Sequence, residues 1–292
     1  MKRFSVHIHG WLMLLPAAVL LAAFTHYPAL ATLWASFHST ARAGHAAVWV
    51  GLDNYQSMAE DPVFWKVLRN NLWYALGTIP LSIGLALLMA VWANGKLRGR
   101  AFLRVAYFTP TVLPMIAVAN IWLFFYTPDY GLLEQISVGL LGLPSHNWLG
   151  SPSTALGCLI VVAIWKDAGF FMIFYLAALQ SIPTALADAA AIEGAGRWYY
   201  FRRVVLPLLM PTTLFVLINA VINSFRLVDH IIVMTKGGPD NASALLLYYI
   251  YDVAFKFWDS GYASALTMVL LLILAGAAIF QFAFLEKRIH YQ

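Results

Sequence analysis

Six long stretches of the chain are almost entirely apolar, and shorter polar segments separate them. A helix needs about 20 apolar residues to cross the roughly 30 Å hydrocarbon core of a bilayer. Each stretch reaches that length, so the pattern predicts an all-α membrane protein with six transmembrane helices. The predicted spans are residues 11–36, 70–93, 105–127, 154–180, 206–226 and 262–284.

The first apolar stretch has some features of a signal peptide. Lys2 and Arg3 precede it, and Ala41-Arg42-Ala43 resembles a cleavage site. Its length of about 25 residues, however, exceeds the apolar core of a signal peptide. We therefore expect a retained first helix.

The positions of Lys and Arg predict the orientation, because cytoplasmic segments carry an excess of these residues. The N-terminus, the second and fourth connecting segments and the C-terminus together carry eleven of them, whereas the remaining three connections carry six although they are on the whole longer. Both termini are therefore predicted to be cytoplasmic. The eleven residues are Lys2, Arg3, Lys96, Arg98, Arg100, Arg104, Arg197, Arg202, Arg203, Lys287 and Arg288.

Composition narrows the possible functions. The chain is 62% hydrophobic and only 11% charged, whereas about a quarter of the residues of a soluble domain are charged. Its formal charge of +5 is spread over short segments without interleaved aromatics, which argues against nucleic-acid binding. Cys158 is the single cysteine, so an internal disulfide and a cysteine-based metal site are both excluded. With no internal repeat, one membrane domain over residues 1–292 is the simplest organisation.

The segment 181–206 between the fourth and fifth spans is predicted to hold a short helix outside the membrane. Pro183 suits a helix start, an alanine-rich run follows, and Gly194 and Gly196 suit its end. Asp188 and Glu193 give this helix a polar side. Its apolar side consists of Leu186, Ala189, Ala190 and Ile192. An amphipathic helix outside the membrane suggests a docking surface.

The same segment carries a spaced motif: Asp188-Ala189-Ala190, then Gly194 after three residues, then Val204-Val205-Leu206-Pro207 after nine more. It resembles the E-A-A, G, I-x-L-P signature of permease subunits of ATP-binding-cassette importers, with Asp in place of Glu and Val in place of Ile. In that family the motif docks an ATPase subunit. The docking residues that the resemblance implies are Asp188, Ala189, Ala190, Glu193, Gly194, Arg197, Leu206 and Pro207.

Three further segments narrow the resemblance to carbohydrate-uptake permeases of the maltose and glycerol-phosphate type. They are Gly51-Leu52-Asp53-Asn54-Tyr55, Ala178-Leu179-Gln180-Ser181-Ile182-Pro183 and Met234-Thr235-Lys236-Gly237-Gly238-Pro239. The last departs from the usual T-G-G-G-P at Lys236. Gly237, Gly238 and Pro239 are expected either to contact a binding protein or to form an ordinary turn.

The resemblance implies the type I importer permease fold in a bacterial inner membrane, surrounded by membrane lipid. A second permease subunit would complete the pore, as a heterodimer. Two cytoplasmic ATPase subunits would bind ATP and Mg, and a periplasmic or lipid-anchored binding protein would deliver the solute. The chain itself lacks a G-x-x-x-x-G-K-[ST] phosphate loop, so it is not expected to be an enzyme or to hold a cofactor or metal.

The solute would be a sugar or a sugar derivative, with glycerol 3-phosphate or another anionic derivative as the alternative. A secondary carrier is a second class of function, but such carriers commonly show inverted repeats. A membrane-embedded enzyme is a third class, and the scattered histidines form no H-E-x-x-H motif. Only the ATP-driven importer requires the docking motif.

Polar side chains within the apolar spans mark a candidate substrate pathway, because burying them in a membrane is costly. Asn219 and Asn223 lie on one helical face, and Arg226 could bind an anionic solute. Alternatively, the asparagines bridge helices and Arg226 pairs with Asp229. The candidates are Asn120, Trp122, Asn219, Asn223 and Arg226, with Trp165 a further aromatic. For both tryptophans, packing is the alternative. Lys166 and Asp167 could mark the pathway or pair across helices, and the structural role is favoured.

Overall fold

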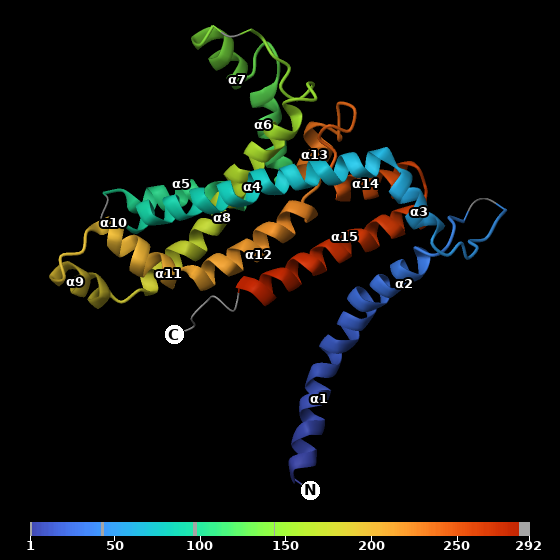
Figure 1. The fold of residues 1–292 in the computed structure, drawn as a ribbon, viewed down its shortest axis with the longest axis horizontal. Coiled ribbons are helices and arrows are strands. Elements are labelled where there is room, and N and C mark those ends of the chain that lie inside the picture. Colours follow the sequence, from blue (N-terminus) through green and yellow to red (C-terminus); the bar gives the residue numbers. More distant parts are fainter. Residues whose placement is uncertain (1, 42–43, 96–97, 143, 286–292) are drawn as a thin grey trace. The chain divides into compact units, whose positions relative to one another are not determined.

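The computed structural model describes residues 2–41, 44–95, 98–142 and 144–285. Within these ranges the chain is helical and contains no strand (Figure 1). A single bridge, between His38 and Trp49, is the one extended pairing there. The expectation of an all-α chain is confirmed. The predicted cytoplasmic residues Lys96, Lys287 and Arg288 lie outside the described ranges, as does Arg42 of the first loop.

Five apolar helical segments are long enough to cross a membrane: Trp11–Ala35, Pro62–Asn94, Ala155–Ser181, Met210–Met234 and Ser260–Ala283. The apolar run at 105–127 is divided between α5 (Arg100–Val112) and α6 (Met115–Tyr126), whose axes are bent by 102°. The described residues therefore contain five candidate spans, or six when the bent pair counts as one. Pro114 at the break accounts for the bend, because proline cannot continue the hydrogen-bond ladder of a helix.

The chain forms two compact units, Met1–Asp61 with Ile250–Leu272, and Pro62–Tyr249 with Ile273–Gln292. The first contains α1 (Lys2–Leu21), the π-helical turn η1 (Ala22–His26), α2 (Tyr27–Ala35), α3 (Asp53–Glu60), η4 (Asp252–Lys256) and the start of α15 (Ser260–Phe280). Two helices, α14 (Leu246–Tyr251) and α15, each have residues in both units.

The motif Gly51–Tyr55 fastens the first connecting segment within the first unit. The Asn54 side-chain amide donates to the backbone carbonyls of Ser36 and His38, both at 2.9 Å. The hydroxyls of Tyr55 and Ser36 lie 2.8 Å apart. These bonds tie α3 to the end of α2, which gives this motif a local structural role.

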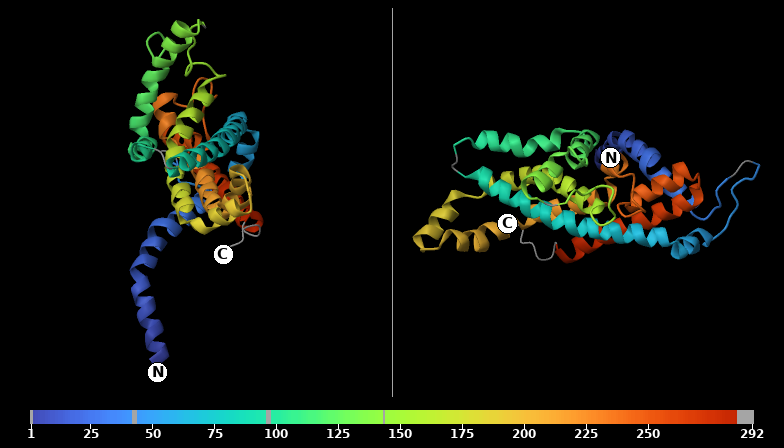
Figure 2. Two further views of the ribbon diagram at one scale, coloured as in Figure 1. Left: turned by 90° about the vertical axis from the view of Figure 1, so that its left-hand side faces the viewer. Right: turned by 90° about the horizontal axis from the view of Figure 1, so that it is seen from above.

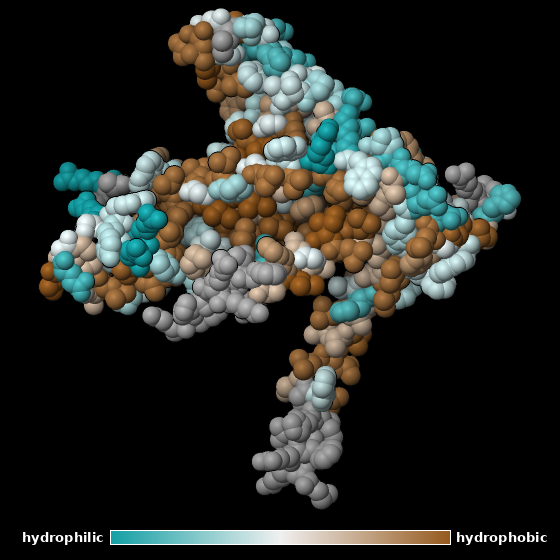
Figure 3. All heavy atoms as spheres, viewed as in Figure 1, coloured by the Kyte–Doolittle hydropathy of each residue, from teal (hydrophilic) through white to brown (hydrophobic). Residues whose placement is uncertain are grey.

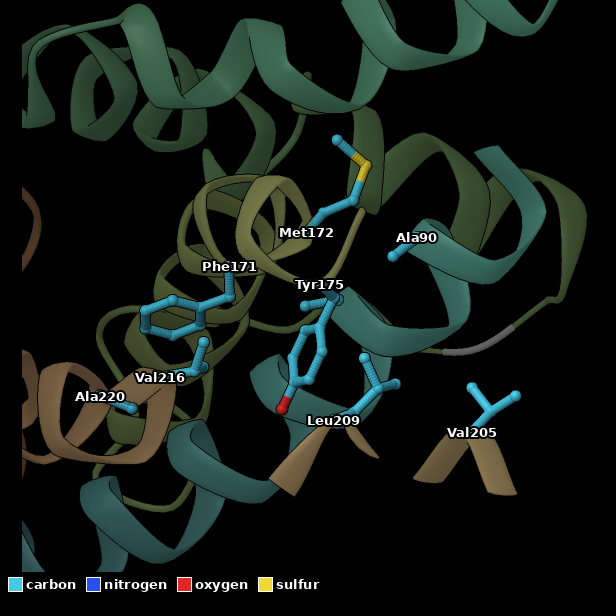
Figure 4. Close-up of a cluster of buried hydrophobic side chains, with 9 residues drawn as sticks. Ala90, Phe171, Met172, Tyr175, Val205, Leu209, Val216 and Ala220 are labelled. Atoms are coloured by element: carbon cyan, nitrogen blue, oxygen red, sulfur yellow. The ribbon is translucent and has the colours of Figure 1, made fainter. Parts of the chain in front are cut away.

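The second unit is built on α4 (Pro62–Asn94) and α8 (Ala155–Ser181), which pack along each other and against α5 and α12 (Met210–Arg226) (Figures 1 and 2). Ala86 and Ala90 are fully buried, and small residues of this kind let helix backbones approach closely. In Figure 4, Phe171 points toward Val216 and Ala220, while Tyr175 lies beside Leu209. The Tyr175 hydroxyl donates to Thr213 Oγ1 at 3.1 Å, so its polar atom is satisfied inside this core.

The outward faces of the second unit remain apolar. Figure 3 shows hydrophobic side chains across its helices, with hydrophilic side chains near α9 and near the start of α4. Leu72 and Leu88 of α4, for example, are more than half exposed. An apolar exterior of this extent suits lipid or a partner subunit and not water.

The shorter helices of the second unit connect these long ones, except for the last of them, which follows α15. They are α7 (Leu132–Glu134), η2 (Gln135–Leu140), α9 (Thr184–Ile192), α10 (Arg197–Tyr200), η3 (Phe201–Val205), α11 (Leu206–Leu208), α13 (Asp229–Met234) and η5 (Gln281–Leu285).

Candidate functional sites

The predicted docking helix is present as α9, and all of its residues except the half-buried Ala190 are exposed. It begins at Thr184, directly after Pro183, and none of its residues is buried. Figures 1 and 2 show it beyond the ends of α8 and α12 in the second unit. Ile192, on the predicted apolar side, is 88% exposed. The helix therefore offers both its polar and its apolar side to a partner.

Gly194 determines how this helix ends. Its φ of +74° lies in the left-handed region, which favours glycine. The N–H of Gly194 donates to the carbonyl of Ala191 at 3.1 Å, and the N–H of Ala195 donates to that of Ala190 at 2.9 Å. This pair of bonds is a Schellman cap. A Cβ on Gly194 would meet no atom of this chain within 4 Å, so the space beside it is open.

The far end of the motif is anchored in the helical core. Leu206 is half-buried and Pro207 is exposed, and the two begin α11. Their neighbours Val205 and Leu209 are 6% and 0% exposed, and both belong to the buried cluster with Tyr175. The docking segment is thus joined to the packed helices through these two side chains, neither of which is among the predicted docking residues.

The segment with the Gly237-Gly238-Pro239 turn is held tightly to the start of α4. Lys66 Nζ lies 2.9 Å from Asp240 Oδ2 and also donates to the Asp240 carbonyl. The buried Asn70 amide donates to the carbonyls of Asn241 and Ala244, at 2.8 and 3.0 Å. We call residues 235–245 the pinned loop.

A second asparagine extends this network. The Asn71 side chain accepts the N–H of Leu246 at 3.1 Å and donates to the carbonyl of Ser224 at 3.2 Å. Gly237 lies against Tyr248, because a Cβ at this position would come within 2.5 Å of the Tyr248 ring. The sequence did not predict these bonds between the start of α4 and the loop, which are made by Lys66, Asn70 and Asn71. The sign in the sequence was a set of polar residues at the start of an apolar helix, of which Lys66 and Asn70 are spaced four apart and share one face.

The candidate pathway residues are only partly brought together. Asn219 and Asn223 lie one turn apart on α12, with Arg226 at its end. The Asn219 amide donates to the Phe215 carbonyl of its own helix at 2.8 Å. On α6, the Asn120 amide likewise donates to the Ile116 carbonyl at 2.8 Å. No hydrogen bond links the α6 and α12 asparagines among the described residues. The alternative pairing of Arg226 with Asp229 is also absent from the described part of the chain.

Residues 82–291 match the family described as "Binding-protein-dependent transport system inner membrane component". The chain belongs to this family. It is 33% identical over 96% of its length to the lactose transport system permease protein LacF of Rhizobium radiobacter, covering 95% of that protein. It is 32% identical over 99% of its length to the sn-glycerol-3-phosphate transport system permease protein UgpA of Brucella abortus, covering 98% of it.

The fold agrees with this assignment. A solved bacterial alginate ABC transporter, in complex with an alginate pentasaccharide-bound periplasmic protein, contains a chain that superposes with a TM-score of 0.83. The match covers 96% of this chain and 94% of that one at 22% identity. The resemblance inferred from the docking motif is thereby confirmed, and the chain is the permease component of a binding-protein-dependent importer.

Trp122 of the permease belongs to an aromatic cluster between α6 and α8. Its ring centroid lies 5.8 Å from that of Trp165, edge to face, and 5.5 Å from that of Tyr126. It also lines a cavity of about 670 Å³ with Trp148 and Cys158. The indole nitrogens of Trp122 and Trp148 are buried and have no acceptor among the described residues. These contacts favour the packing alternative for Trp122 and Trp165.

A buried polar pair joins α4 to α13 of the permease. The hydroxyl of Tyr74 lies 3.0 Å from Nε2 of His230, and the two side chains are 1% and 0% exposed. Because α13 also packs on α6, this pair contributes to fixing the bent region of the second unit. The histidines are scattered along the sequence, and their spacing gives no sign of this contact.

Proposed function

We propose that this permease is one of two pore subunits in an ATP-driven importer of a sugar or sugar derivative, located in a bacterial inner membrane. In this proposal residues 1–292 act as one membrane domain that crosses the bilayer six times, with α5 and α6 forming one broken span and both termini in the cytoplasm. The Lys and Arg distribution supports this orientation.

The exposed and capped helix α9 is the observation that carries the proposal. In the importer, α9 would insert into a groove of an ATPase subunit. Leu186 and Ile192 would bury apolar surface, while Asp188 and Glu193 would meet polar groups at the rim. Arg197, at the start of the next helix, is exposed and available to an acidic partner.

Movement of the ATPase subunits would reach the pore through the anchored end of the motif. Leu206 and Pro207 begin the helix that follows Val205, and Val205 and Leu209 contact the core of α4 and α8. Because packed helices move as rigid bodies, a displacement of α9 would be passed to these spans. Two ATPase subunits would bind ATP and Mg, and a second permease subunit would complete a heterodimeric pore.

The solute is proposed to pass along the polar face of α12. Asn219 and Asn223 suit the hydroxyl groups of a sugar, and both neutral and anionic solutes appear in the names of related permeases. Arg226 is exposed and forms no ion pair among the described residues. An unpaired guanidinium at the end of this face favours an anionic derivative as the second candidate.

The pinned loop is proposed to contact the solute-binding protein. Its Asp240 side chain is 87% exposed although its backbone is fixed by Lys66 and Asn70. A rigid, exposed loop loses little conformational freedom on binding, which favours association. Gly237, Gly238 and Pro239 would shape this contact surface.

Co-purification from cells that express the permease with its neighbouring genes tests the proposal. We expect an ATPase to co-purify, and we expect its turnover to rise when the co-encoded binding protein and one member of a panel of neutral and anionic sugars are added. Recovery of the permease without an ATPase, but with solute uptake driven by an ion gradient, would support a secondary carrier instead.

A further inference from the structure

The break between α5 and α6 leaves a backbone carbonyl without its helical donor. In a continuous helix, the N–H of residue 114 would donate to the carbonyl of residue 110. Residue 114 is proline and has no N–H. The carbonyl of Pro110, and that of Leu113 at the break itself, therefore need another donor, because unsatisfied carbonyls are costly within a membrane.

Lys166 supplies that donor from a different helix. Its Nζ donates to the Pro110 carbonyl at 3.1 Å and to the Leu113 carbonyl at 2.5 Å. A lysine ammonium group has three N–H donors, so two of them are used at the break. Lys166 lies near the middle of α8, 53 and 56 residues away in the sequence.

Gly169, one turn after Lys166, sets the distance between the two helices. A Cβ at Gly169 would lie 2.3 Å from the Tyr107 carbonyl oxygen and 3.1 Å from Thr111 Oγ1. Residues three apart share a helical face, so Lys166 and Gly169 both meet α5. The glycine permits the close backbone approach that brings the ammonium group within reach of the break.

We propose that Lys166 is a positioning residue that holds the bend between α5 and α6, in place of the hydrogen bond that Pro114 removes. This role assigns a function to a charged residue in the middle of a span, and it does not depend on the docking role of α9. The bend is then fixed by a side chain of α8, so a movement of α8 is transmitted directly to α5 and α6.

Distance measurement across the bend tests this role. In a Cys158→Ser background, spin labels at Phe102→Cys on α5 and Phe124→Cys on α6 occupy exposed positions. Pulsed electron paramagnetic resonance on the assembled importer in lipid nanodiscs should give a narrow distance distribution. We expect Lys166→Met to broaden it, and the matched control Lys256→Met, at a lysine that pairs with Asp252 four residues earlier, to leave it unchanged. An unchanged width in Lys166→Met overturns the proposal.

A second variant keeps the test decisive if Lys166→Met assembles poorly. Pro114→Ala restores the N–H that can bond to the Pro110 carbonyl. The loss of melting temperature, or of assembly, caused by Lys166→Met should therefore be smaller in the Pro114→Ala background than in the parent. An equal loss in both backgrounds would show that Lys166 stabilises the protein in some other way, and would overturn the proposal.

Discussion

The side-chain amide of Asn70 donates a 2.8 Å hydrogen bond to the backbone carbonyl of Asn241, which is 171 residues later in the chain. The same amide also bonds to the Ala244 carbonyl. One buried side chain thus fixes both ends of a tight turn. This contact is one of several that hold residues 235–245 in a defined conformation.

Replacing Asn70 with Leu should loosen the pinned loop. Two buried carbonyls would lose their donor, which costs about 1–3 kcal/mol in stability. We expect a lower melting temperature of the purified importer and faster proteolytic cleavage within residues 235–245. The control is Asn120→Leu, because Asn120 is exposed and its amide bonds, within the described part of the chain, to the Ile116 carbonyl of its own helix. Equal effects of the two substitutions would contradict the role of Asn70.

Gly194 and Gly196 provide a matched pair for testing the end of the docking helix. Gly194 has a φ of +74°, whereas Gly196 has a φ of −66° and precedes α10 as its N-cap. Gly194→Ser should cost about 1 kcal/mol and reduce ATPase co-purification, while Gly196→Ser should be tolerated because serine is a favourable N-cap.

A bulkier change at the same position adds a steric obstacle to docking to the backbone strain at the end of the helix. Gly194→Trp should abolish uptake while leaving membrane insertion intact, since the added side chain points into space that this chain leaves open. Normal uptake by Gly194→Trp would remove the docking role from this helix.

The polar face of α12 can be tested by replacing Asn219 and Asn223 together with Leu. Each hydrogen bond to a polyhydroxylated solute contributes roughly 0.5–1.5 kcal/mol of binding free energy. Because two such bonds would be lost, we expect uptake at limiting solute to fall about tenfold. ATPase co-purification should not change. Ile222→Leu on the same helix is the control. Unchanged uptake by the double variant would leave the asparagines with a packing role only.

The sequence predicts those features of the permease that depend on local pattern. Apolar runs of sufficient length predict the spans, and the Ala-rich run that ends at Gly194 predicts α9, because propensity and a left-handed cap are encoded within a few residues. The docking motif could be recognised for the same reason, since its spacing lies within one segment.

Contacts between distant segments could not be predicted in this way. Asn70 and Lys66 bond to backbone carbonyls of the pinned loop, and a carbonyl carries no sequence signal. Lys166 stands out in the sequence as a charge within a span, but its partners are again carbonyls. The pair Pro110 and Pro114 was the available sign that residues 105–127 do not form one straight helix.

Site-directed cross-linking of the assembled importer tests the proposed arrangement of the permease most directly. A photoreactive label on Ala189→Cys, in the Cys158→Ser background, should capture an ATPase subunit. The same label on Asp240→Cys should capture the solute-binding protein and no ATPase. Failure to capture an ATPase from position 189, or its capture from position 240, would contradict the proposal that α9 is the docking helix.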